Sequence, residues 1–68
     1  MNTQMLEHAY DLYLVIQDDQ SKLARASYLA RDNQELHEAY QRRLYAIENT
    51  LRRIEDLLDK NGYKYKTR

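Results

Sequence analysis

The chain has 68 residues, no Cys, and eleven Lys and Arg residues balanced by eleven Asp and Glu residues. So short a chain buries only a small core, and the lack of Cys excludes both disulfides and thiolate zinc sites as a means of stabilising it. Because the charges balance and no apolar run approaches 18 residues, neither nucleic-acid nor membrane binding is favoured, and we expect a soluble, cytoplasmic protein without a signal segment.

Residues 3 to 31 are predicted to form a first helix. Apolar side chains recur there every three or four residues, the spacing that gathers them on one face of a helix. Either Asn2 or Thr3 can cap its start, because short polar side chains accept hydrogen bonds from the free amides of a first turn.

The centre of this first helix is more polar than its ends. Gln17 and Gln20 fall on the apolar face, and the neighbouring Asp18 and Asp19 are poor residues for a helix interior, so a kink or break is one alternative. If the helix continues, Asp18 stands one turn before Lys22 and can pair with it. We therefore expect a continuous helix with a weak layer at the two glutamines, and we expect their replacement by Leu to stabilise the protein.

The chain offers one internal candidate for a turn, just before a capping box. In this box the Asp32 side chain accepts from the amide of Glu35, and the Glu35 side chain reaches back to the amide of Asp32. A second helix is then predicted over residues 33 to 60. It ends at Asn61 and Gly62, because glycine readily adopts the left-handed conformation that closes a last turn.

The second helix carries the clearest pattern in the chain. Its apolar residues recur at alternating steps of four and three, and at about 100° per residue they lie within an arc of roughly 80°. They are Leu36, Tyr40, Leu44, Ile47, Leu51, Ile54 and Leu58. The opposite side is charged, so one face of this helix needs a partner.

Two helices of nearly equal length about a tight turn predict an all-α fold, an antiparallel helical hairpin. If the chain reverses at residue 32, residues whose numbers sum to about 64 face each other, so Tyr13 meets Leu51 and Tyr28 meets Leu36. The alternative is a single continuous helix in an extended coiled coil. We prefer the hairpin because a capping box inside a helix would have no purpose.

A hairpin of this size cannot bury all of its apolar residues. Residues 12 to 16 are all apolar, so the first helix is apolar nearly all round at that level and needs burial on more than one side. We therefore expect two hairpins to dimerise into a four-helix bundle. The residues predicted to contact a second copy or a larger protein are Leu12, Tyr13, Val15, Ile16, Leu29 and Tyr45.

No pattern of a catalytic, metal or cofactor site is present in the sequence. A single Gly excludes glycine-rich phosphate loops and dinucleotide fingerprints. His8 and His37 lie at opposite ends of the predicted hairpin, about 25 Å apart by helix rise, so one chain cannot bring both to one metal ion. We expect both to be exposed to solvent, and we predict no enzymatic activity and no cofactor.

A C-terminal tail, residues 63 to 68, follows the hairpin domain of residues 1 to 62. The tail alternates tyrosines with basic residues, which suits stacking on bases and contact with phosphates. The candidate nucleic-acid contacts in the tail and on the second helix are Arg42, Arg53, Tyr63, Lys64, Tyr65, Lys66 and Arg68. The alternative is an ordinary tail that packs on the end of the bundle through Tyr63.

By elimination, the sequence predicts a small non-enzymatic interaction module. Its apolar and tyrosine residues exceed what one hairpin can bury, which favours a regulator or inhibitor that occupies a surface of a larger protein. Weak, salt-dependent nucleic-acid binding through the tail is the alternative. It is opposed by residues 1 to 60, which carry a net charge of −3 because the neutral chain has three basic and no acidic residues after them.

Overall fold

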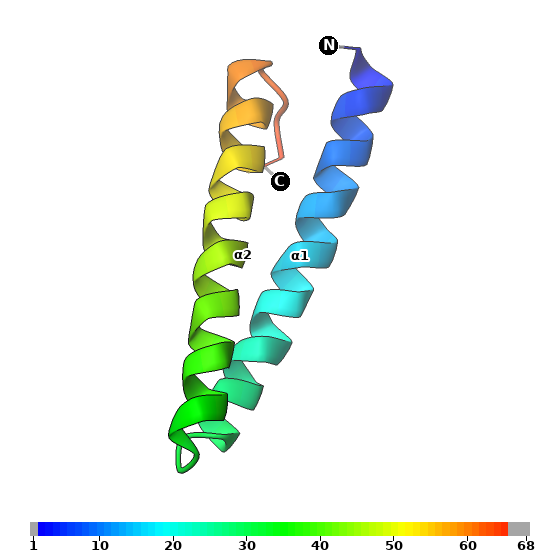
Figure 1. Cartoon of the computed structure of the whole chain (residues 1–68). Helices are drawn as coiled ribbons and strands as arrows, with labels where there is room; N and C mark the ends of the chain where they lie inside the picture. Colours follow the sequence, from blue (N-terminus) through cyan, green and yellow to red (C-terminus); the bar gives the residue numbers. More distant parts are fainter. Residues whose placement is uncertain (1, 66–68) are drawn as a thin grey trace.

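The structure, a computed structural model, describes residues 2 to 65. It contains two helices of 27 residues each, α1 (Thr3–Leu29) and α2 (Gln34–Lys60), and the described residues form no strand. The helices run antiparallel and pack against each other in a body of 46 × 19 × 17 Å (Figure 1). The predicted all-α hairpin is therefore confirmed. Neither helix combines the length and the apolar character that a membrane span requires.

The first helix, α1, is continuous through its polar centre. It begins with Asn2 as the cap, whose side chain accepts from the amide of Met5 at 2.8 Å. Asp18 and Lys22 form the expected ion pair one turn apart, at 3.0 Å, on the solvent side of the helix. The expected continuous helix is confirmed, without the break that was its alternative, and it ends two residues earlier than expected.

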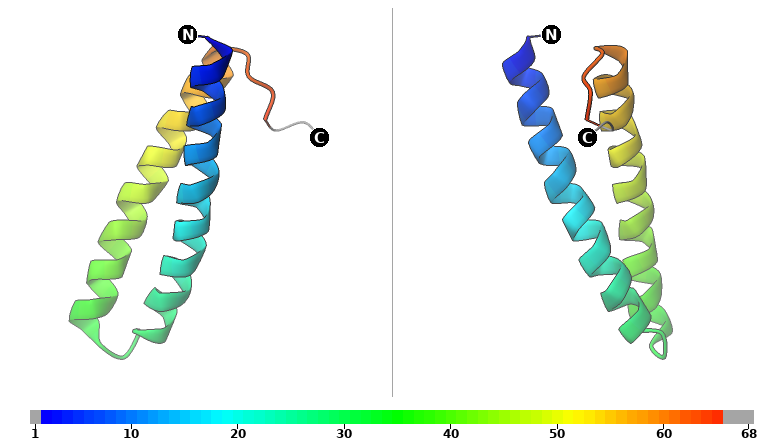
Figure 2. Two further views of the ribbon diagram at one scale, coloured as in Figure 1. Left: turned by 90° about the vertical axis from the view of Figure 1, so that its right-hand side faces the viewer. Right: turned by 180° about the vertical axis from the view of Figure 1, so that it is seen from behind.

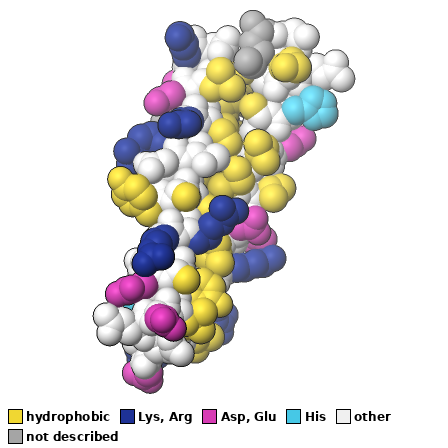
Figure 3. All heavy atoms as spheres, in the orientation of Figure 1, with side chains coloured by type: hydrophobic (Ala, Val, Ile, Leu, Met, Phe, Trp, Pro, Cys, Tyr) yellow, Lys and Arg dark blue, Asp and Glu magenta, His cyan; other side chains and the backbone are white. Residues whose placement is uncertain are grey.

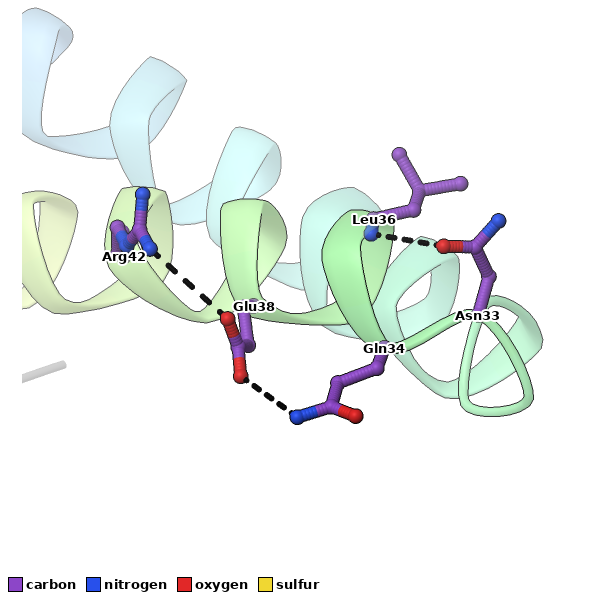
Figure 4. Close-up of polar contacts among 5 residues, drawn as sticks. All are labelled: Asn33, Gln34, Leu36, Glu38 and Arg42. Atoms are coloured by element: carbon purple, nitrogen blue, oxygen red, sulfur yellow. Dashed lines mark hydrogen bonds and ion pairs between the residues drawn. The ribbon is translucent and has the colours of Figure 1, made fainter.

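The turn between the helices differs from the prediction by one residue. The Asn33 side chain, and not that of Asp32, caps α2 by accepting from the amide of Leu36 at 3.0 Å (Figure 4). The predicted capping box of Asp32 and Glu35 is therefore wrong. Because the turn extends through Asp32, the third helical position is Leu36, whose apolar side chain cannot complete a box.

The second helix, α2, ends as predicted, with Gly62 in the left-handed conformation (φ +69°). The amide of Tyr63 donates to the carbonyl oxygen of Leu58 at 2.9 Å, and that of Gly62 donates to Asp59 at 3.1 Å. This pair of bonds is a Schellman motif. It turns the chain, so that residues 63 to 65 run back beside the helices instead of away from them (Figures 1 and 2).

The core follows a seven-residue spacing along both helices. This spacing keeps one side of each helix toward the other over its whole length. The buried apolar residues are Leu6, Tyr13, Ile47, Leu51 and Leu58. Tyr13 packs with Ile47 and Leu51, close to the expected pairing, and Ile16 adds to this cluster.

Gln17 does not lie in the core. Its side chain is exposed and donates to the hydroxyl of Tyr13 at 3.1 Å, whereas Gln20 is half-buried. The expectation that both glutamines lie on the apolar face is therefore wrong for Gln17. Ile16 follows Tyr13 by three residues and Gln20 follows it by seven, so both turn toward α2, whereas Gln17 lies at the edge of the contact.

The layer nearest the turn is polar, which the sequence did not predict. Tyr28 and Leu36, expected to face each other, are 64% and 46% exposed. Ser27 is buried in their place, and its hydroxyl accepts from the side-chain amide Nε2 of Gln41 at 2.7 Å. Its carbonyl oxygen accepts from Nδ1 of His37 at 2.9 Å, so His37 is half-buried and not in open solvent as expected. The small, buried side chain of Ser27 thus occupies the position between the helices that was expected for Tyr28.

Candidate protein-interaction surfaces

Eight large apolar side chains of the described residues remain exposed. They are Met5, Leu12, Leu14, Val15, Tyr28, Leu29, Leu36 and Tyr45. Single exposed apolar residues are normal on a protein surface, so what matters is which of them lie together. Six of them, all but Leu14 and Tyr28, belong to two surfaces, one on each side of the plane that contains both helices.

The first surface, which we call the Leu12 surface, comprises Met5, Leu12, Val15, Leu29 and Leu36. The four residues of α1 are separated by seven, three and fourteen positions, so at about 100° per residue they span an arc of about 120° around the helix. Leu12, Val15 and Leu29 are 51%, 58% and 70% exposed. Figure 3 shows apolar side chains gathered in two areas of one face, with charged side chains between them.

A cleft between the helices lies at the middle of the Leu12 surface. It has a volume of about 120 Å³ and is lined by Ile16, Asp19, Arg43, Ala46, Ile47 and Thr50. Asp19 follows Leu12 by seven residues and Val15 by four, which places it on the same side of α1. The cleft therefore carries the charges that interrupt the apolar surface.

The second surface is a wider groove on the opposite side of the hairpin. Its volume is about 810 Å³, and its lining residues are Gln20, Ser21, Ala24, Gln41, Arg42, Leu44, Tyr45 and Glu48. Half-buried Leu44 is its largest aliphatic side chain, and Tyr45, 69% exposed, stands beside it. A groove with an apolar floor, an exposed tyrosine and a polar rim has the composition of a protein-binding site.

The six residues predicted to contact a partner therefore do not form one patch. Leu12, Val15 and Leu29 belong to the Leu12 surface, and Tyr45 belongs to the groove. The other two, Tyr13 and Ile16, pack in the core of the hairpin.

Tyr13 is held in place by its hydroxyl as well as by its ring. The hydroxyl donates to a carboxylate oxygen of Glu55 at 2.6 Å, so that α1 and α2 are joined by a charge-assisted hydrogen bond. This bond, and secondarily burial of the phenol, raises the pKa of Tyr13 to about 12. The side chain thus serves the hairpin itself and is not available to a partner.

The tail tyrosines also pack on the hairpin. The ring of Tyr65 lies 5.5 Å from that of Tyr13 and 5.9 Å from that of Tyr10, and the ring of Tyr63 lies 5.8 Å from Tyr10. These four rings form a tyrosine cluster between the tail and α1. Stacking of Tyr63 or Tyr65 on bases, as the nucleic-acid alternative requires, would need release of the tail. Lys64 is exposed.

The two nucleic-acid candidates of α2 do not gather into one basic site. Arg42 is exposed and pairs with Glu38 at 3.9 Å (Figure 4), which offsets its charge. Arg53 is exposed eleven residues later, about 17 Å along the helix at 1.5 Å per residue. Lys66 and Arg68 lie outside the described residues.

No group of three or more His, Asp or Glu side chains within residues 2 to 65 could hold a metal ion. Comparisons with family models, curated proteins and solved structures gave no match to this chain. The two surfaces are therefore the basis on which a function can be proposed.

Proposed function

We propose that the protein is a small, non-enzymatic interaction module that forms a homodimeric four-helix bundle and regulates or inhibits a larger protein by occupying one of its surfaces. The observation that carries this proposal is the exposure of Leu12, Val15 and Leu29 on one side of α1, each more than half accessible to water. Burial of a large apolar side chain contributes about 1.5 to 3 kcal/mol, so a surface of this kind is stabilised by contact with another.

The Leu12 surface is best matched to a second copy of the hairpin. It follows α1 and reaches Leu36 of α2, so two hairpins that meet through it bring four helices around one core. A dimer of this kind leaves the groove beside Tyr45 on the outside. Tyrosine suits a surface that is wet when free and buried when bound, because its ring is apolar and its hydroxyl polar. The groove is therefore the surface we assign to the larger protein.

Sedimentation equilibrium tests the dimer directly. We expect the wild-type chain to sediment at twice its 8.3 kDa mass, and the Leu12→Glu/Val15→Glu variant to sediment as a helical monomer. Tyr45→Glu is the matched control, because it places a carboxylate at another exposed position, outside the Leu12 surface. A wild-type protein that stays a folded monomer at tens of micromolar would contradict the dimer.

The regulatory role is tested through the groove. The immobilised wild-type protein and its Tyr45→Glu and Leu14→Glu variants are compared for capture of proteins from an extract of the native host, followed by mass spectrometry. We expect a specific larger protein that the wild type and the Leu14→Glu control retain and that Tyr45→Glu loses. Retention of the same proteins by all three would show that the groove is not the binding surface.

A further inference from the structure

Two opposite charges interrupt the Leu12 surface halfway along the hairpin. Asp19 of α1 and Arg43 of α2 line the same cleft, and both side chains are exposed. The ion pairs found within residues 2 to 65 include neither of these two residues, and each of them joins residues one turn apart on a single helix. The hairpin therefore presents one carboxylate and one guanidinium in the middle of an apolar surface, without pairing them to each other.

The two charges lie at the same level of the hairpin. Asp19 is three residues beyond the midpoint of α1, and Arg43 is four residues before the midpoint of α2. Both positions are thus about 5 Å nearer the turn than the middle of the molecule, at 1.5 Å per residue. This placement makes the charges sensitive to the way in which a second copy is docked.

A symmetric pair of hairpins has two ways to meet through this surface. If the two-fold axis is parallel to the helices, α1 of one chain lies on α2 of the other at the same level, and Asp19 faces Arg43. Leu29 and Leu36, which flank the turn, then also face each other. If the axis is perpendicular to the helices, α1 lies antiparallel on its own copy. Asp19 then falls at the level of residue 13, beside exposed Leu12, and a carboxylate is buried against an apolar side chain.

We propose that Asp19 of each chain pairs with Arg43 of a second copy, so that the dimer axis runs parallel to the helices and both turns lie at the same end of the bundle. The inference rests on the proposed dimer and adds its geometry. Opposite charges that meet across an interface fix its register and exclude arrangements in which like charges, or a charge and an apolar group, would meet.

The test is a mixture of two single variants. A chain with Asp19→Arg presents two cations at the interface, and a chain with Arg43→Asp presents two carboxylates. Each homodimer then brings like charges together, whereas the mixed dimer pairs both sites. We expect each variant alone to dimerise at least about tenfold more weakly than the wild type, and the mixture to form more than about nine-tenths mixed dimer by native mass spectrometry.

The matched control separates this pairing from attraction between chains of opposite net charge. The variants Asp18→Arg and Arg42→Asp change the net charge by the same amounts at neighbouring positions whose side chains pair within their own helix. We expect their mixture to form close to the random share of mixed dimer. If Asp19 and Arg43 instead paired within one chain, the mixture of their variants would show no preference for mixed dimers. The mixing experiment therefore distinguishes pairing between chains from pairing within a chain.

The position of the turns provides a second measurement. Because the chain has no Cys, Asp32→Cys introduces a single site for a spin label in the exposed turn. Turns at the same end give a label separation on the order of 20 to 30 Å, since packed helices stand about 10 Å apart. Turns at opposite ends give a separation close to the 46 Å length of the hairpin.

The outcomes separate this inference from the proposed dimer. A dimeric wild type with a strong preference for the mixed dimer and a short label separation supports the inference. A dimeric wild type with no such preference, or with the long separation, overturns the docking geometry and leaves the dimer intact. A monomeric wild type overturns both.

Discussion

Tyr13 belongs to α1, yet its hydroxyl donates to Glu55 of α2 and its ring packs against Tyr65 of the tail. One side chain thus joins three segments that are distant in the sequence. Its hydroxyl also accepts from Gln17 of the same helix, so both of its hydrogen-bonding roles are used. The contribution of this hydroxyl can be separated from that of the ring by removing a single atom.

Tyr13→Phe should lower the free energy of unfolding by about 1 to 2 kcal/mol, because Glu55 loses a charge-assisted hydrogen bond while the apolar ring remains. Urea unfolding followed by circular dichroism measures the difference. Tyr45→Phe is the control, since Tyr45 is 69% exposed and its change should stay within about 0.5 kcal/mol. Equal effects of the two substitutions would show that the bond to Glu55 contributes nothing.

The same hydroxyl should make stability depend on pH in the alkaline range. The pKa of Tyr13 is raised from 10.0 to about 12 in the folded protein, so the fold favours the protonated phenol. This contribution is fully present below pH 10 and is lost as the pH rises from 10 to about 12. Wild type should therefore lose more stability over this range than Tyr13→Phe, in urea midpoints measured at fixed protein concentration. Parallel losses would contradict the raised pKa.

At the level of single residues, the sequence predicted which face of each helix is apolar but not every member of that face. Ser27 lies fourteen residues after Tyr13, and the seven-residue spacing of the core predicts that it lies between the helices. The position was missed because the prediction considered apolar residues only. A buried serine is tolerated there because it forms hydrogen bonds with Gln41 and His37 of the other helix. Bonds between two helices cannot be recognised from the sequence pattern of either helix alone.

Among the elements, the start of α2 depends on one amide side chain. Asn33→Ala should destabilise the protein by about 1 kcal/mol, because the side chain that accepts from the amide of Leu36 is lost. Asp32→Ala, one residue earlier in the exposed turn, should change the stability by less than about 0.5 kcal/mol. Thermal unfolding of both variants compares the two caps. A larger loss for Asp32→Ala would favour the capping box instead.

The helices and their ends could be predicted largely from the sequence because the signals are local. Apolar spacing within α1 and α2, the short polar residue at Asn2 and the glycine at position 62 each act within one or two turns. The cap of α2 was misplaced because Asp32 and Asn33 are equally suited to capping. The choice between them depends on how many residues the chain needs to reverse, and this is a property of the packed pair of helices.

Across the whole molecule, the tail closes the end of the hairpin that is remote from the turn. Residues 63 to 65 turn back beside the helices there (Figure 1). Tyr65 packs on the central core cluster and Tyr63 on Tyr10. The sequence offered docking through Tyr63 as an alternative to a free tail, but the contact of Tyr65 with Tyr13 joins residues 52 positions apart and could not be predicted from local patterns.

Tyr65→Ala should lower the melting temperature by about 4 to 8 °C, the equivalent of about 1 kcal/mol in a domain of this size, because a half-buried ring is removed from the tyrosine cluster. Lys64→Ala is the control, since its side chain is exposed. Both are compared with the wild type by circular dichroism at one protein concentration. A tail that contributes no packing would give identical melting curves.

The polar contacts between the helices near the turn have a further consequence, for the order in which the chain folds. The bond between Ser27 and Gln41 closes a loop of 14 residues, whereas that between Tyr13 and Glu55 closes one of 42. Closing the longer loop first costs about 1 kcal/mol more in chain entropy. Folding should therefore start at the turn and advance toward the termini, and the tyrosine cluster should form last. Local opening of the native protein should follow the reverse order and begin at the termini. Amide hydrogens of the terminal turns should therefore exchange with solvent well before those beside Ser27.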